Sequence, residues 1–265
     1  MKPQRITFGR MHPNAGYEAK YRREIKRMIK AMREDTRREV RALYGEVTHD
    51  AKRATLATTM AKLRKKWYKV FEKRAREMSR WLANSVMRRT RRDILNQLKA
   101  IGLAIKPNYT DTEKVLINEI VQNGVDLIKT IPRDYLREVQ EIVNEAVVRG
   151  GDRAAIKEAI EDKFDHPLVK TAEQAERRAE LIAKDQVQKA TQDFAMDNAK
   201  AYGATKGEWI HVPGEFTSRI THMHMDGQLF DLDVGMFDED VGDFVKPGEL
   251  PYCMCTFQAV FPGVE

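Results

Sequence analysis

The chain has 265 residues, of which 42% are hydrophobic and 33% are charged, and its formal net charge is +7. This composition excludes a disordered chain and allows one sizeable hydrophobic core or two smaller ones. No apolar run reaches the ~18 residues of a membrane-spanning helix, so we expect none. The first residues lack the apolar core of a secretion signal, and a chain with only two cysteines favours a reducing compartment.

Two long helices are predicted in the first hundred residues. Residues 17–43 carry apolar side chains at helical spacing, and residues 51–101 contain neither Pro nor Gly. In the second segment the apolar positions recur in steps of four and three, at Leu56, Met60, Leu63, Trp67 and Val70. A helix this long cannot bury its apolar stripe alone, so we predict an antiparallel helical hairpin. Residues 1–16 are expected to form an arm that is flexible or docked on a partner.

Shorter helices are predicted in the middle of the chain. One helix begins near residue 112, and Pro132 is expected to interrupt it and to start the next, which runs to residue 148. Two glycines end that helix, and a further helix is predicted over residues 152–164. The last helix, residues 171–202, should dock the C-terminal region. Its apolar face carries Ala175, Ala179, Ile182, Ala183 and Val187, and Gly203 follows as a C-terminal cap.

Beyond residue 203 the composition changes to Gly, Pro, Asp and aromatic residues. Short strands are predicted at residues 208–212, 228–232 and 255–261, which with one docking helix make a small α+β unit. The acidic stretch 231–243 is expected to be a solvated loop, because its spacing does not fit a calcium-binding EF-hand.

The predicted fold class is therefore mainly α, with a long N-terminal helical hairpin and a helical middle, followed by a small α+β C-terminal domain with short strands. The predicted segments are a basic helical hairpin at 1–106, a helical middle at 107–170 and the C-terminal α+β domain at 171–265.

Side chains that can bind a metal gather in this last segment. The only cysteines, Cys253 and Cys255, would point to one face of a strand. With His222 they would supply three ligands of a tetrahedral zinc ion, and Asp226, His224 or water would supply the fourth. The alternative is that both cysteines are small buried apolar residues and that His222 hydrogen-bonds a loop carbonyl. The predicted metal set is His222, Cys253, Cys255 and Asp226, and zinc is the only cofactor that the sequence suggests.

Charge is distributed unequally along the chain. Residues 1–106 hold 30 Lys and Arg against 10 Asp and Glu, whereas residues 107–265 hold 17 against 30. This asymmetry favours a polyanionic partner for the basic half, with nucleic acid ahead of an acidic protein surface or a membrane. The alternative is a solvated helical face with ion pairs. The predicted contact residues are Arg64, Lys65, Lys66, Lys69, Lys73, Arg74, Arg76, Arg88, Arg89, Arg91 and Arg92.

Several short motifs follow one another in a specific order after residue 137. They are Ala179 to Lys184, Gly203, Trp209, His222, Asp226-Gly227, Pro247-Gly248 and Cys253-x-Cys255. In this order they resemble the Mu F-like phage head morphogenesis family, the minor head proteins, over about residues 137–262. That family usually reads Ile-Ala-Arg-Thr-Glu where this chain reads Ile-Ala-Lys-Asp-Gln from Ile182. It commonly has Arg where this chain has Met254.

The resemblance implies a non-enzymatic minor head protein of a tailed phage or prophage. Such a protein is made in the host cytoplasm, acts in head assembly and occupies the portal vertex or capsid interior of the virion. Its implied partners are the portal protein and other head proteins. The basic hairpin would bind the phosphates of double-stranded DNA without sequence preference.

The alternative function is a zinc-dependent, nuclease-like enzyme that processes nucleic acid, in which His222 or His224 activates water. A nucleobase deaminase would need His-x-Glu and Pro-Cys-x-x-Cys. Here His224 stands in the place of that Glu, and the cysteine spacing is one residue short.

Overall fold

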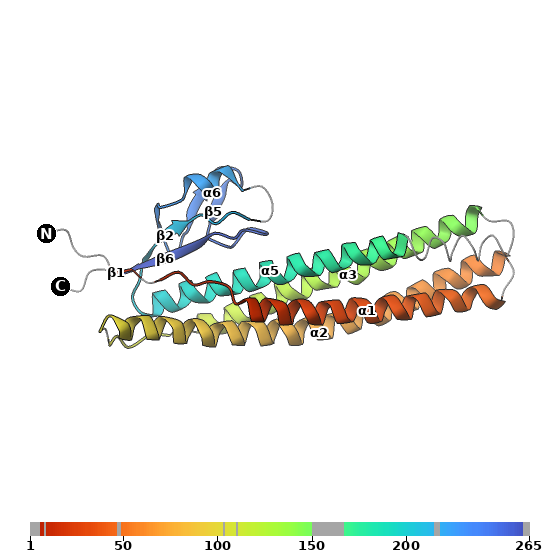
Figure 1. Cartoon of the computed structure of the whole chain (residues 1–265), viewed down its shortest axis with the longest axis horizontal. Helices are drawn as coiled ribbons and strands as arrows, with labels where there is room; N and C mark the ends of the chain where they lie inside the picture. Colours follow the sequence, from red (N-terminus) through yellow and green to blue (C-terminus); the bar gives the residue numbers. More distant parts are fainter. Residues whose placement is uncertain are drawn as a thin grey trace. The chain divides into compact units, whose positions relative to one another are not determined.

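The structure is a computed structural model that describes residues 6–7, 9–46, 49–102, 104–109, 111–149, 167–214 and 218–261. Four long helices precede a small region of short antiparallel strands, so the predicted fold class is confirmed (Figure 1). The elements are β1 (Ile6–Thr7), α1 (Ala15–Glu46), α2 (His49–Ala100), α3 (Thr112–Arg149), α5 (Pro167–Ala201), β2 (Lys206–Ile210), α6 (Ile220–His224), β3 (Leu229–Asp231), β4 (Met236–Asp238), β5 (Asp243–Val245) and β6 (Thr256–Phe261). None of the described helices has both the length and the apolar composition needed to cross a membrane.

The chain forms two compact units, each made of separate stretches. The first unit contains residues 1–19, 79–121 and 183–265, and the second contains residues 20–78 and 122–182. These two units combine separate stretches of the chain, whereas the three predicted segments are each continuous in the sequence. The division into those three segments stays a prediction.

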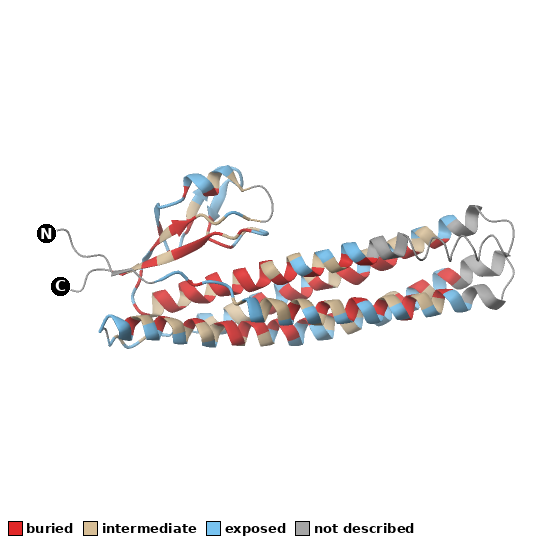
Figure 2. Ribbon diagram, viewed as in Figure 1, coloured by how far each residue is buried: buried red, intermediate tan, exposed pale blue. Residues whose placement is uncertain are grey.

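The second unit consists of parts of α1, α2, α3 and α5. Figure 2 shows buried residues recurring along one side of these helices, as expected for amphipathic helices that share a core. Its largest fully buried side chains include Tyr21, Ile25, Ile29, Met32, Met60, Phe71 and Ile128. Polar contacts join neighbouring helices at the rim: Lys26 Nζ donates to Glu180 (2.7 Å), and Arg178 donates to Asp134 (2.7 Å).

The predicted helices are found with longer bounds, except at Pro132. The predicted interruption there is wrong, because α3 continues through Pro132. A proline inside a helix removes one backbone hydrogen bond. The cost is offset because the residues around it, Ile128, Ile131 and Leu136, are all buried. The helix predicted over residues 152–164 lies outside the described residues.

The first unit contains a four-stranded antiparallel sheet in the order β1-β6-β2-β3 and a separate β4–β5 hairpin. The three predicted strands correspond to β2, β3 and β6. The acidic stretch 231–243 is not merely a solvated loop, because it includes β4 and the fully buried Asp238. The N-terminal arm docks on its own chain, since Ile6 pairs with Phe261 and Met11 is buried.

Candidate functional site

The buried metal-binding side chains predicted in the C-terminal region come from two segments of the first unit. His222 is buried in α6, and Cys253 and Cys255 are buried in the segment that leads into β6. A turn closed by the Cys253 N–H and the Leu250 carbonyl places the first thiol. Tyr252 in this turn has φ of 59°, a left-handed conformation that is uncommon for a residue with a side chain.

Two polar residues of α5 hold this segment in place. Asp185 accepts a hydrogen bond from the Tyr252 backbone N–H at 2.6 Å. Gln188 donates from Nε2 to the backbone carbonyls of Met254 (3.1 Å) and Cys255 (2.8 Å), and its side chain is buried. Both residues lie in or just after the Ile-Ala-Lys-Asp-Gln motif. That part of the motif therefore fixes the backbone that carries the cysteines.

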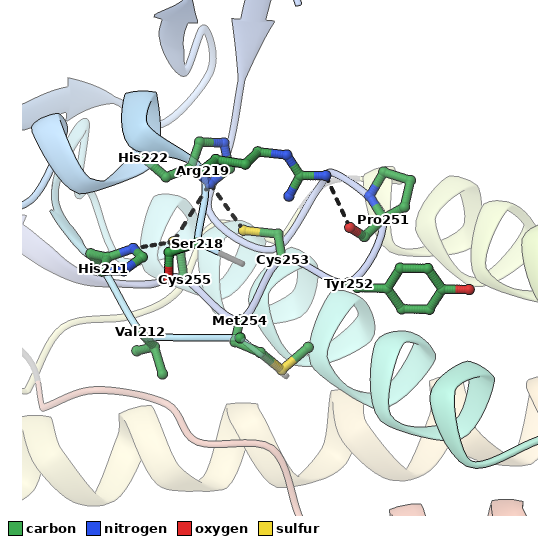
Figure 3. A pocket seen from close by; sticks show the side chains of 11 residues that line it. His211, Val212, Ser218, Arg219, His222, Pro251, Tyr252, Cys253, Met254 and Cys255 are labelled. Carbon is green, nitrogen blue, oxygen red and sulfur yellow. Dashed lines mark hydrogen bonds between the residues drawn. The ribbon is translucent and has the colours of Figure 1, made fainter. Parts of the chain in front are cut away.

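The histidine and both thiols converge on one point (Figure 3). His222 Nδ1 lies 3.4 Å from Cys253 Sγ and 3.6 Å from Cys255 Sγ. The ligand atoms of these three residues all lie within 4.8 Å of one another. His211 lies at the edge of this group: its Nδ1 is 3.5 Å from Cys255 Sγ, but it is not one of the three residues whose ligand atoms all lie close together.

The far side of the His222 ring contacts a buried carboxylate. Asp238 Oδ2 lies 3.1 Å from His222 Nε2, and both side chains are almost completely buried. Asp238 also accepts the backbone N–H of Asp240. A carboxylate at Nε2 favours the tautomer that is protonated there, which leaves the Nδ1 lone pair facing the two sulfurs.

The two thiols influence each other strongly. Their mutual hydrogen bond lowers the pKa of Cys253, against the opposing effect of burial, and His222 lowers it further. The same hydrogen bond, together with burial and the neighbouring negative charge, raises the pKa of Cys255. The first proton therefore leaves easily, and removal of the second needs a compensating positive charge.

A cavity of about 280 Å³ borders the cluster. His211, His222, Cys253 and Cys255 all contribute to its wall, together with Arg219 and other residues, as Figure 3 shows. Its outer rim is fixed in part by Arg219, which donates to the Pro251 carbonyl at 3.2 Å. Small ions and water can therefore reach the donors from solvent.

The structure brings together His222, Cys253 and Cys255 as predicted, but not Asp226. Asp226 is exposed, and its carboxylate accepts the His211 backbone N–H at 2.7 Å, outside the cluster. His224 is also exposed. Sequence reasoning missed His211 and Asp238. His211 was placed inside the predicted strand 208–212, whereas in the structure it directly follows β2, and Asp238 is one of many acidic residues in the stretch 231–243, so neither stood out in the sequence.

The basic residues predicted on α2 divide into paired and unpaired groups. Ion pairs are formed by Lys66 with Asp35, Arg74 with Glu77, Arg76 with Glu72, Arg89 with Asp93 and Arg91 with Glu113. The others form no ion pair or hydrogen bond through their side chains within the described part of the chain. They are Arg64, Lys65, Lys69, Lys73, Arg88 and Arg92, and all except Arg64 are exposed.

The unpaired lysines of the second unit share one helix face. Lys62, which sequence reasoning did not single out, is also exposed and unpaired among the described residues. It precedes Lys65, Lys69 and Lys73 in steps of three, four and four, so the four ammonium groups line one side of α2. At about 100° per residue, this side is opposite the buried Leu63, Trp67 and Phe71.

Residues 137–258 match the family described as Phage Mu protein F like protein. This region belongs to that family. The Phage Mu protein F-like region contains His211, His222, Asp238, Cys253 and Cys255, and it begins within α3. The family consists of structural proteins of phage head morphogenesis. The basic helices α1 and α2 precede the matched region.

The similarity to one curated protein extends beyond the Phage Mu protein F-like region. An uncharacterized protein of Haemophilus influenzae is 26% identical over 247 residues, which are 89% of this chain and 51% of that protein. The chain thus spans about half the length of this relative. No solved structure matches the chain.

Proposed function

We propose that this protein is a minor head protein of a tailed phage or prophage that acts at the portal vertex and contacts packaged double-stranded DNA through α2. The Phage Mu protein F-like region supports the role in head assembly. The portal protein and other head proteins are the proposed protein partners. The DNA contact rests on one observation, the row of exposed and unpaired lysines on α2.

This row has the properties that phosphate binding requires. Lys62, Lys65, Lys69 and Lys73 face solvent without carboxylate partners among the described residues. Their ammonium groups are therefore free to displace the counterions of a polyanion. Lysine binds phosphate as a flexible point charge, so such a row favours binding without sequence preference.

The neighbouring helix α1 adds cations of the same kind. Arg23, Lys30 and Arg41 are exposed and form no ion pair with other described residues. By contrast, Asp134 on α3 attracts Arg133, Arg137 and Arg178. Unpaired positive charge is therefore concentrated on the first two helices rather than spread evenly over the four.

The DNA contact is tested by replacing Lys65, Lys69 and Lys73 together with Gln in the full chain. The control removes the same charge from α3, by replacing Lys114, Lys129 and Arg137 with Gln. Fluorescence anisotropy with two duplexes of equal length and unrelated sequence gives the affinity at several salt concentrations. We expect the α2 variant to bind at least about tenfold more weakly, with a salt slope smaller by about 3, while both duplexes bind alike.

Equal affinities for the α2 variant and the α3 control would refute the DNA contact. The portal association is tested separately, by co-purification with the portal protein encoded by the same phage genome. Absence of a complex would count against the proposed location. Duplex degradation that is lost in His222→Ala would instead support the alternative, a nuclease-like enzyme.

A further inference from the structure

His222 Nδ1 lies within hydrogen-bonding distance of two thiols at once. Its Nδ1 lies near both Cys253 Sγ and Cys255 Sγ, yet an imidazole nitrogen has a single lone pair. One thiol S–H can therefore donate to it and the other cannot. The third sulfur contact, between Cys255 and His211, places a further nitrogen beside one of the two sulfurs.

The distances match the edges of a tetrahedron around zinc. With zinc–sulfur bonds of about 2.3 Å and zinc–nitrogen bonds of about 2.05 Å, tetrahedral angles separate nitrogen from sulfur by about 3.5 Å. Three of the four nitrogen–sulfur edges of such a shell are already present: His222 lies 3.4 Å from Cys253 Sγ and 3.6 Å from Cys255 Sγ, and His211 lies 3.5 Å from Cys255 Sγ.

The surroundings also suit a metal-bound histidine and thiolate. Asp238 contacts the Nε2 side of His222, as carboxylates commonly do behind a histidine that ligates a metal. The buried indole N–H of Trp209 has no hydrogen-bond partner. The Trp209 ring packs edge-on against His222, with centroids 5.1 Å apart. Thiolates at this position would give that N–H an acceptor.

We propose that His211, His222, Cys253 and Cys255 bind a structural zinc ion. The two thiol protons are released to solvent, and two thiolates with two neutral imidazoles complete the tetrahedral shell. Because His211 supplies the fourth ligand, no coordination position is left for a reactive water. The cavity beside the donors gives the ion access from solvent.

The ion would connect three segments that are far apart in the sequence. His211 follows β2, His222 belongs to α6, and the cysteines precede β6. In the described part of the chain, His222 of α6 contacts both thiols, and Arg219, which precedes α6, donates to the Pro251 carbonyl. Zinc would thus fix α6 to the sheet, and this role is independent of DNA binding.

The proposal is tested on the full chain by equilibration with zinc, removal of free metal and elemental analysis. We expect one zinc per chain, and cobalt substitution should give the intense visible bands of a tetrahedral site with thiolate ligands. His211→Ala should lower zinc affinity by more than about tenfold, and Cys253→Ser with Cys255→Ser should abolish stoichiometric binding. His224→Ala is the matched control, since His224 is exposed on the same helix, and its affinity should not change.

Asp238→Asn tests the positioning role of the buried carboxylate. It should keep the tetrahedral cobalt spectrum but lower affinity by about 10–100-fold, whereas Asp240→Asn should not. Circular dichroism verifies that each variant is folded. A folded parent chain that binds no stoichiometric zinc would overturn the proposal. An unchanged affinity in His211→Ala would overturn the closed four-ligand shell.

Discussion

Asp35 on α1 is the residue through which α1 and α2 make their most specific polar contact. It accepts hydrogen bonds from Trp67 Nε1 (2.9 Å) and Lys66 Nζ (2.7 Å). Arg38, on the same helix, also forms an ion pair with the Asp35 carboxylate. Burial by itself would raise the pKa of Asp35. The hydrogen bonds from Lys66 and Trp67 and the nearby positive charges outweigh that effect, so the pKa lies below its usual value.

Because the folded-state pKa of Asp35 is depressed, its contribution to stability is present above the unfolded-state pKa and is lost on further acidification. We expect Asp35→Asn to lower the free energy of unfolding by about 1–3 kcal/mol at pH 7. The difference from the parent should begin to shrink as the pH falls below about 4 and should vanish once the pH is below the depressed folded-state pKa. Denaturant titrations at several pH values measure it. Glu34→Gln, at an exposed neighbouring position, should change stability by less than about 0.5 kcal/mol throughout.

At the scale of elements, glycines with positive φ end helices and close turns. Gly203 follows α5 with φ of 94°, and no atom lies near the position of an added Cβ. Gly235 lies between β3 and β4 with φ of 95°, and an added Cβ would lie 2.5 Å from the backbone oxygen of Val245. The first position requires glycine for its conformation alone, and the second also requires it for space.

These two sites predict different costs for the same substitution. Gly203→Ala should destabilise the protein by about 1 kcal/mol, the strain of a left-handed alanine. Gly235→Ala should cost more, because the β4–β5 hairpin must shift to relieve a contact with backbone. Thermal unfolding of both variants provides the comparison. Equal losses would show that the packing at Gly235 relaxes freely.

At the scale of the whole molecule, the two proposed sites belong to different compact units. Lys65, Lys69 and Lys73 lie in the second unit, whereas the four proposed zinc ligands lie in the first. The two sets share no hydrogen-bond or ion-pair partner among the described residues. Sites without shared partners usually act additively.

We therefore expect the two activities to separate. The variant with Gln at residues 65, 69 and 73 should bind zinc with the affinity of the parent. The double variant Cys253→Ser and Cys255→Ser should retain its DNA affinity within about twofold. Anisotropy and elemental analysis of both variants, run side by side, measure the separation. Loss of DNA binding in the cysteine variant would mean that the metal region also takes part in the DNA contact.

The sequence by itself determined the long helices, the three main strands and the Phage Mu protein F-like region, because these depend on local periodicity and on the order of short motifs. It also indicated that His222 and the cysteines belong together. Only the tertiary structure decided the continuation of α3 through Pro132, the contact of Asp238 with His222, and the position of His211 rather than Asp226 beside Cys255. These features arise from contacts between residues distant in the chain, where burial and packing outweigh local preference.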